Sequence, residues 1–524
     1  MIVVKKYISK INSTALYCLL AAIVAITVCS KSSFLYPLND WGDTNCYFII
    51  GKGILKGLVP YRDLYDQKGI IIFAIYSLAC LITTNSYFGV YIIEIVAAFL
   101  FLYISVKIVS LYLECDRYSG VIALILAVAV YSSAAMCHGG SAEELLLPAF
   151  AYGIYVISKQ IQTRSIPRKL EMLIFGLCAG IIFYSKYTLC AIFIPIIIIM
   201  MVDAYKNKSL GLLMNRALYF ILGCLVITIL VLVYFALNGA LFDFFNAYFY
   251  NNIHNYVDED FSKQFSSVLD VYLFYIKVFF RKRNILPILL IGLSLIWLFI
   301  KKKYLLFICY VLSFAAFFYI EFFVAMPLKY YGIPLYCFCS PGLCFIVELL
   351  KKIPAYKPLI ANAAMVLLAV CLCYVFTDNK YMMFKDIEDT PQYILADDIK
   401  QDGSNDYSLL VYNALDEGFY HSCNTLPVER AFIQTNLKTS FLQDEQNNMI
   451  NDQRVDYIIT TKYLCDTTEY EEVYQNNKDY IETYTDNYTP YIVCFDDFGY
   501  ELVDQTAAYF EKKYKIYKLY KRIE

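Results

Sequence analysis

Long apolar runs limit what this chain can fold into more than any other feature. They recur from residue 12 to residue 377, and many reach the roughly 20 residues that a helix needs to cross a bilayer. Only 17% of the 524 residues are charged, against about 25% in soluble domains. The pattern predicts a polytopic α-helical membrane protein. The apolar runs lie near 12–30, 70–84, 88–111, 119–137, 145–158, 171–185, 187–203, 211–237, 284–300, 304–326, 331–349 and 357–377.

Lysine- and arginine-rich stretches set the order of these runs across the membrane, because short basic loops stay cytoplasmic. All the basic stretches fall on one side only if the run 70–84 lies along the outer surface instead of spanning. We therefore predict about 11 spans in a plasma membrane of bacterial type, with a cytoplasmic N-terminus. The first run has no cleavage site after it and is expected to be a retained span. The basic stretches are Lys5 to Lys10, Lys159 to Lys169, Lys206 to Arg216, Lys301 to Lys303 and Lys351 to Lys357.

Charge divides the chain near residue 377. Residues 1–377 carry 30 basic and 18 acidic side chains, and residues 378–524 carry 14 basic and 28 acidic ones. We predict a transmembrane domain over 1–377 and a small soluble extracytoplasmic α/β domain over 378–524. Segments rich in Val, Ile and Tyr favour strands in the second part. The strands are predicted at 408–412, 456–460, 491–495 and 515–521, and helices at 388–400 and 503–513.

The stretch 40–69 concentrates charged groups and turn-forming residues beside the first span. A helix over 44–56 is predicted, capped by Asp43 and resting Tyr47 and Ile50 on lipid. Asp66 and Lys68 precede the next apolar run. A carboxylate in such a place can act as a general base toward an acceptor hydroxyl, and a lysine can hold a lipid-linked phosphate. A solvated connecting loop is the simpler interpretation.

Four motifs of this stretch carry a resemblance to a known family. Asp43-x-Asn45, Gly51-Lys-Gly-Ile-Leu-x-Gly57, Val59-Pro-Tyr-Arg-Asp63 and Tyr65-Asp-Gln-Lys-Gly69 resemble the first outer loop of the GT-C glycosyltransferase superfamily. The nearest likeness is to bacterial family-39-like members, which are related to protein O-mannosyltransferases and to the aminoarabinose transferase of lipid A. The resemblance implies a many-helix membrane domain that transfers a sugar, with inversion, from a polyprenyl-phosphate carrier on the outer face. The acceptor would be a glycan, lipid or protein hydroxyl.

The resemblance also implies roles for particular residues. Asp43 would be the base, and Asp66 with Lys68 would match the acidic-lysine pair of the family's first loop, although Gly69 stands where relatives often have proline. His138 to Glu144 resembles a second outer loop, and Lys329-Tyr330-Tyr331 stands where relatives show a histidine-tyrosine pair. The predicted site residues are Asp43, Asp66 and Glu143 for catalysis, Lys68, Lys186 and Arg62 for the donor phosphate, and Tyr61, Glu144, His138 and His254 for the substrate.

Simpler interpretations remain open for each group. Asp43 could only cap a helix, Asp66 and Lys68 could form a surface ion pair, and Glu143 or Glu144 could only favour a helix N-terminus. A divalent metal held by Asp66 and one of the two glutamates also stays open. Two other classes of protein compete with an enzyme: a lipid or polysaccharide flippase, and a scaffold whose acidic domain binds a partner. Against a transporter, the sequence shows no repeat of two halves.

Overall fold

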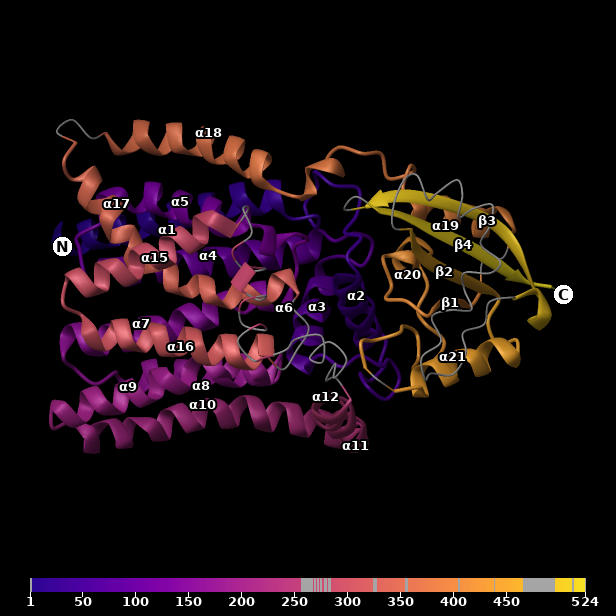
Figure 1. Cartoon of the computed structure of the whole chain (residues 1–524), viewed down its shortest axis with the longest axis horizontal. Coiled ribbons are helices and arrows are strands. Elements are labelled where there is room, and N and C mark those ends of the chain that lie inside the picture. Colours follow the sequence, from indigo (N-terminus) through magenta and orange to yellow (C-terminus); the bar gives the residue numbers. More distant parts are fainter. Residues whose placement is uncertain are drawn as a thin grey trace.

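The computed structural model describes residues 2–255, 284–323, 328–353, 357–403, 406–437, 439–464, 495–510 and 513–523, and isolated positions between 267 and 280. Long helices lie side by side in a bundle, and a small α/β region sits at one end of it (Figure 1). This arrangement confirms the predicted fold class, a helical membrane domain followed by a small α/β domain.

The helical part contains both long helices and short pieces near the α/β region. Its helices are α1 (Ile2–Cys29), α2 (Gly42–Leu55), α3 (Ile70–Ile82), α4 (Phe88–Ser110), α5 (Ser119–Tyr131), α6 (Ala142–Leu145), α7 (Leu147–Thr163), α8 (Lys169–Phe183), α9 (Phe193–Lys206), α10 (Leu210–Leu237), α11 (Leu241–Phe244), α12 (Asn252–His254), α15 (Ile285–Ile300), α16 (Tyr304–Phe323), α17 (Leu343–Leu350) and α18 (Pro358–Phe376). The 3₁₀ segments η3 (Tyr187–Ile192) and η6 (Lys329–Gly342) continue into α9 and α17.

Within the described residues, six helices are long and apolar enough to cross a membrane, so the chain is an integral membrane protein. Shorter apolar helices cover Ser13–Cys29, Ile70–Ile82 and Ile285–Ile300. The number of about 11 spans stays a prediction. The six are Phe88–Ser110, Tyr187–Lys206, Leu210–Leu237, Tyr304–Glu321, Lys329–Leu350 and Pro358–Phe376.

The helix α3 covers the run that was predicted not to span. Its 13 residues would extend only about 20 Å, against a hydrocarbon core of about 30 Å. Figure 1 shows α3 beside α2, at the end of the bundle that meets the α/β region. That α3 stays at one surface of the membrane remains a prediction.

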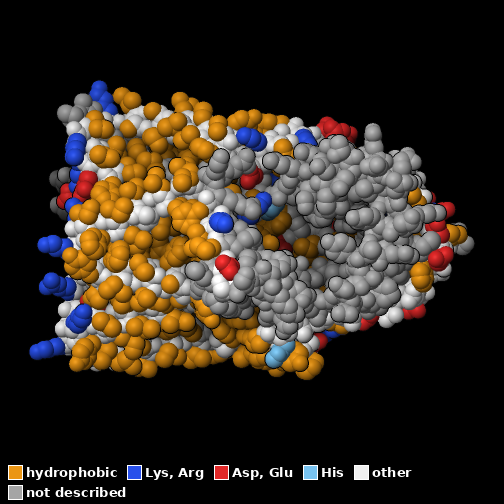
Figure 2. All heavy atoms as spheres, in the orientation of Figure 1, with side chains coloured by type: hydrophobic (Ala, Val, Ile, Leu, Met, Phe, Trp, Pro, Cys, Tyr) orange, Lys and Arg blue, Asp and Glu red, His pale blue; other side chains and the backbone are white. Residues whose placement is uncertain are grey.

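The surface of the bundle has the character of a lipid-facing protein. Hydrophobic side chains cover the middle of the visible face, and lysine and arginine side chains gather at the end remote from the α/β region (Figure 2). The sharp turn between α15 and α16, which carries Lys301 to Lys303, is one source of this charge, since all three side chains lie near or at the surface. The described basic loops thus lie away from the α2 and α3 end.

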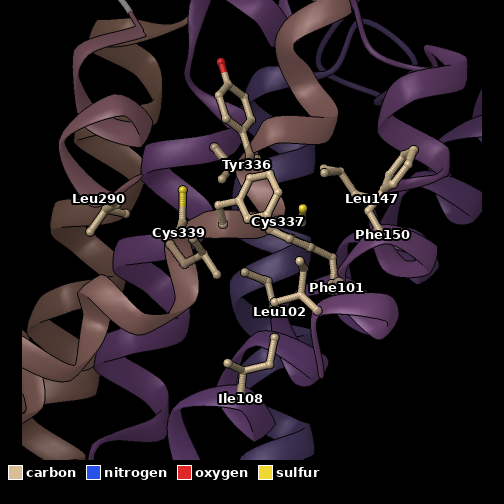
Figure 3. Close-up of a cluster of buried hydrophobic side chains, with 14 of the residues drawn as sticks. Phe101, Leu102, Ile108, Leu147, Phe150, Leu290, Tyr336, Cys337 and Cys339 are labelled. Atoms are coloured by element: carbon tan, nitrogen blue, oxygen red, sulfur yellow. The ribbon is translucent and has the colours of Figure 1, made fainter. Parts of the chain in front are cut away.

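Inside the bundle, η6 fills the centre. Its residues from Tyr331 to Gly342 are buried, and Pro334 and Pro341 lie within it. Proline lacks the N–H that a regular α-helix needs, which accounts for a 3₁₀ path that is unusually long. Figure 3 shows Tyr336, Cys337 and Cys339 of η6 surrounded by apolar side chains of α4, α7 and α15. The segment therefore carries its first residues, Lys329 to Tyr331, to a fixed place.

The C-terminal α/β region is built on one four-stranded sheet. The strands are β1 (Leu409–Tyr412), β2 (Tyr457–Leu464), β3 (Tyr500–Phe510) and β4 (Lys513–Arg522), in the order β1-β2-β4-β3. β1 and β2 are parallel, and the other neighbours are antiparallel. The helices α19 (Pro391–Gln401), α20 (Phe419–Ser422) and α21 (Phe441–Asn451) complete the region.

Three predicted strands and one predicted helix agree with the structure in part or in whole, and one helix is wrong. Strands occur at 409–412, 457–464 and 513–522, and α19 covers most of 388–400. The described part of the segment, 503–510, is not helical, because it belongs to strand β3, which pairs with β4, and tertiary pairing overrides local helix preference. The predicted strand 491–495 lies mostly outside the described residues.

A second hydrophobic core joins the two parts of the chain. It contains Tyr47 and Phe48 of α2 and Phe73 of α3, and it continues without a break into Leu410 and Phe419 of the α/β region. The α/β region is therefore packed onto the stretch 40–69 and is not a separate unit on a tether. This packing decides how the candidate site is held.

Candidate functional site

Asp43 lies in the first turn of α2, half-buried, at the end of the bundle that meets the α/β region. It does not cap the helix as predicted: Trp41 takes the cap position, and its side chain makes no capping hydrogen bond. The hydroxyl of Tyr330 donates to Oδ2 of Asp43 at 3.0 Å. Asp43 thus stands in the first turn of the helix, where acidic side chains are common.

The faces of α2 also differ from the prediction. Tyr47 and Ile50 are 1% and 0% exposed, so neither rests on lipid. Tyr47 packs against Phe73 and Tyr76 of α3, with ring centroids 6.0 and 5.4 Å away. On another side Phe48 meets His421 of the α/β region, with ring centroids 5.4 Å apart. The helix is amphipathic in sequence but enclosed by protein, which no pattern within 44–56 reveals.

Asp66 is buried in the same region, and its Oδ1 accepts the backbone N–H of Lys68 at 3.1 Å. Burial raises the pKa of Asp66 to about 6. The neighbouring charges oppose each other, since Lys68 lowers this pKa and Asp43 raises it. These influences show that Asp43, Asp66 and Lys68 are close enough to interact electrostatically.

Lys186 lies between α8 and η3 and is surrounded by acidic and aromatic groups. Its Nζ is 3.1 Å from Oε1 of Glu143 and 2.7 Å from Oε2 of Glu321. The ammonium also sits 3.4 Å from the centre of the Tyr331 ring, a cation–π contact. Glu143 and Glu321 are 2% and 1% exposed. The two buried carboxylates thus share one lysine.

Glu143 connects this group with the first one. Burial raises its pKa, while Lys186 and then Lys68 lower it. Lys68 therefore acts on both Asp66 and Glu143. The structure thus brings together five of the predicted residues, Asp43, Asp66, Lys68, Glu143 and Lys186.

Glu144 points elsewhere, as expected for a residue about 100° further around a helix. Its Oε2 accepts the backbone N–H of Gly140 at 2.9 Å, and its N–H donates to Ser141 Oγ at 3.0 Å. It lines a small cavity together with Trp41, His138 and Tyr330. The His138 ring stacks on Trp41 with centroids 5.0 Å apart and planes 11° apart, and burial lowers its pKa well below the usual value. Glu144 and His138 lie beside Tyr330 and not at Lys186.

The other predicted residues do not enter the cluster. Arg62 is exposed, pairs with Asp63 at 2.7 Å and donates to the carbonyl of Asn238 at 2.8 Å. His254 is exposed and stacks on Tyr250, with ring centroids 4.5 Å apart. Tyr61 is only 1% exposed. Its hydroxyl donates to the carbonyl of Lys68 at 2.7 Å, so Tyr61 supports the turn that carries Lys68.

The sequence prediction missed the carboxylates of Glu321 and Glu94. Glu321 pairs with Lys186, and Glu94 of α4 is 0% exposed and accepts from Ser30 Oγ at 2.9 Å. Both stand within apolar runs. An ionisable side chain inside an apolar run is costly and marks a functional place by default, so this signal could have found them.

The acidic residues do not form a metal-binding set. Within the part of the chain that the structure describes, no three His, Cys, Asp or Glu side chains converge in a way that could hold a metal ion. At Lys186, a lysine ammonium stands between the carboxylates of Glu143 and Glu321. Among the described residues, no ligand set matches the divalent metal that the sequence left open.

Comparisons with known proteins bear on this arrangement. Residues 67–235 match the family described as dolichyl-phosphate-mannose-protein mannosyltransferase. No curated protein sequence matches the chain. ArnT from Cupriavidus metallidurans has a similar structure, with a TM-score of 0.58 at 10% identity when bound to undecaprenyl phosphate. In its apo state the TM-score is 0.59 at 11% identity. Each similarity covers 96% of this chain and 97% of ArnT.

The family match includes Lys68, the turn from His138 to Glu144 and Lys186. The structural similarity extends over both the helical bundle and the α/β region, since it covers almost the whole of both chains. This chain therefore has the fold of ArnT, and the predicted resemblance to the GT-C superfamily of membrane glycosyltransferases is confirmed.

Proposed function

We propose that this protein transfers a sugar from a polyprenyl-phosphate carrier to a hydroxyl acceptor, with Asp43 as the general base. The observation that carries the proposal is the proximity of Asp43 to Asp66 and Lys68, with Tyr330 and Tyr331 linking Asp43 to Lys186. The match to dolichyl-phosphate-mannose-protein mannosyltransferases and the fold of ArnT, solved with undecaprenyl phosphate, support the choice of donor.

In the proposed step Asp43 accepts the proton of the acceptor hydroxyl while that oxygen attacks the anomeric carbon. The bond between the anomeric carbon and the phosphate oxygen breaks, and its electron pair leaves with the lipid phosphate. One base is enough for such an inverting displacement, and no covalent intermediate is needed. The hydrogen bond from Tyr330 fixes one oxygen of Asp43, which leaves the other oxygen to receive the proton.

The two lysines of the cluster have different surroundings, and we assign them different roles. Lys186 is held by two buried carboxylates and an aromatic ring, so its charge is already balanced. Lys68 is half-buried beside Asp66, and we assign it to the departing phosphate, whose negative charge an ammonium stabilises. Lys186 then keeps Glu143 in place. Arg62 is outside the cluster and has no part in this assignment.

An apolar cavity gives the carrier a place for its isoprenoid chain. It has a volume of about 350 Å³ and is lined by α15, α16 and η6, with Ile291, Tyr310 and Phe338 among its residues. Phe338 stands eight residues after Tyr330, which is about 16 Å along a 3₁₀ helix at roughly 2 Å per residue. A prenyl chain of a few units spans that distance.

The charge pattern supports an outer location for the site. Basic side chains gather at the end of the bundle remote from α2 and the α/β region, and basic loops stay in the cytoplasm. We therefore propose that the membrane domain covers 1–377 and that the cluster and the domain 378–524 face away from the cytoplasm. The acceptor, whether glycan, lipid or protein, would then be a component of the cell envelope.

Reconstitution tests the proposal. The purified full-length protein in liposomes is given a panel of radiolabelled undecaprenyl-phosphate sugars, together with an extract of envelope acceptors. Transfer of label from the carrier into an acceptor supports the glycosyltransferase. Movement of labelled lipid between leaflets without transfer would make the protein a flippase. If neither transfer nor lipid movement occurs, the protein is a scaffold. Either of these two results contradicts the proposal.

A further inference from the structure

The stretch that carries Asp43 and Asp66 is held from two sides. α3 packs on one side of it, and the C-terminal α/β region packs on the other through the shared hydrophobic core. The contacts with the α/β region are not spread evenly. Two of them fall on residues that stand directly before the two aspartates.

The first contact is at Gly42, the residue before Asp43. Leu415 of the α/β region closes on it so tightly that a Cβ added at Gly42 would lie 2.8 Å from Leu415 Cβ and 3.1 Å from its Cδ1. Real Cβ atoms do not approach another carbon so closely. Only glycine lets α2 begin at this distance from the α/β region, so Leu415 sets the place of the first turn of the helix.

The second contact is at Tyr65, the residue before Asp66. Its backbone N–H donates to the carbonyl of Arg430 at 3.0 Å. Its ring meets that of Phe441 edge-on, with centroids 5.0 Å apart. The Arg430 guanidinium lies over the Phe441 ring, 5.5 Å from its centre. The same guanidinium pairs with Glu445 of α21. The turn before Asp66 is thus fixed by a main-chain bond and an aromatic contact from another domain.

We propose that the C-terminal domain is a positioning part of the catalytic site, with Leu415 and Phe441 holding Asp43 and Asp66 in register through Gly42 and Tyr65. The proposal rests on the function assigned to Asp43 above. It gives the domain a role in catalysis itself. A misplacement of about 1 Å costs roughly 100-fold in rate, so even a slight loosening is measurable.

The first test removes the aromatic contact in the full-length protein. Phe441→Ala is expected to lower kcat by roughly 10- to 100-fold while the KM for the undecaprenyl-phosphate sugar changes little, and Phe441→Tyr is expected to restore kcat. The matched control is Ile458→Ala in β2, a fully buried side chain of an interior strand. It should lower the Tm of the protein but leave kcat near the wild-type value. A merely structural role of Phe441 would make the two alanine variants behave alike.

The second test uses the close approach at Gly42. Gly42→Ala introduces a collision with Leu415, so kcat is expected to fall. Adding Leu415→Gly removes both atoms that the new methyl group meets, and kcat should recover in part in the double variant, where the alanine methyl group fills some of the space that Leu415 leaves. Because the two residues belong to different domains, recovery can come only from their contact. Equal activity of the single and double variants would overturn the proposal.

Backbone hydrogen exchange separates this proposal from the proposed function. Faster exchange over 40–69 is expected in Phe441→Ala and not in Ile458→Ala, whether or not the wild-type protein transfers a sugar. If the wild type shows no transfer but this difference appears, the function fails and the positioning role stands. If exchange over 40–69 is the same in both variants, the C-terminal domain does not position the stretch.

Discussion

The hydroxyl of Tyr330 donates a hydrogen bond to Asp43 across 287 residues of sequence. Tyr331, the next residue, places its ring 3.4 Å from the ammonium of Lys186. Two consecutive residues of η6 thus join the aspartate in α2 to the lysine group between α8 and η3. Because η6 is buried in the centre of the bundle, the two groups are fixed relative to each other.

Tyr330→Phe tests whether this hydrogen bond supports the base. The variant loses the bond that orients Asp43, and a misplacement of about 1 Å costs roughly 100-fold in rate, so kcat should fall by roughly 10- to 100-fold. The ring itself is kept, and its contact with Trp41 remains, so the Tm should stay close to that of the wild type. A kcat equal to that of the wild type would show that Asp43 does not depend on Tyr330.

Lys186→Met tests the assignment of Lys186 as a counter-charge. It leaves Glu143 and Glu321 without their shared cation, and breaking a buried pair in this way costs about 3–5 kcal/mol. Adding Glu321→Gln should recover a large part of the lost stability. Thermal unfolding in detergent measures both effects. An unchanged Tm in Lys186→Met would contradict the counter-charge role and leave phosphate binding as the role of this lysine.

The pKa of Asp66, raised to about 6 by burial, predicts opposite effects on activity and stability. The carboxylate that faces Lys68 is present only above this pH, so kcat/KM should fall as the pH drops below about 6. Stability should change the other way. A carboxyl group with a raised pKa stabilises the folded state below its unfolded pKa of about 4, and that contribution is lost as the pH rises through about 6.

Asp66→Asn provides the control for this pH dependence. The variant should lose both the acid limb of kcat/KM and the decline in Tm between about pH 4 and pH 6. Its Oδ1 can still accept the N–H of Lys68, so the turn is expected to stay in place. An acid limb that persists in the variant would belong to another group.

Arg62 and His254 provide a prediction of little effect. Both are exposed and have partners outside the cluster, and surface substitutions of this kind usually change stability by less than about 0.5 kcal/mol. Arg62→Ala and His254→Ala should each keep kcat/KM within roughly twofold of the wild type. A loss of more than tenfold in the transfer assay would bring the residue back into the site.

The fold class could be predicted because apolar runs and charge bias are local properties of the sequence. Strand β3 could not be predicted, because its residues favour a helix when no partner strand is considered, and the partner β4 is what makes them a strand. The same holds for α2, whose apolar face looks suited to lipid but is enclosed by α3 and the α/β region. Such partners lie far away in the sequence.

For the candidate site, motif resemblance found the residues near the turns between helices but not those on the long helices. Asp43, Lys68 and Lys186 stand in recognisable motifs. Glu321 stands alone in an apolar run, and only the approach of α16 to η3 shows what it does. The contacts of Leu415 and Phe441 follow from the docking of two domains, which spacing within either domain does not encode.

The most direct test of the account is single-turnover sugar transfer by Asp43→Asn. Asn keeps the size of the side chain and can still accept the hydrogen bond of Tyr330, but it cannot take a proton. Asp63→Asn, a change at a half-buried residue that pairs with Arg62 on the same loop, is the matched control. The account predicts a rate lower by about 10²- to 10⁴-fold for Asp43→Asn, with normal expression and Tm, and a near wild-type rate for Asp63→Asn. A rate for Asp43→Asn within a few-fold of the control would contradict it.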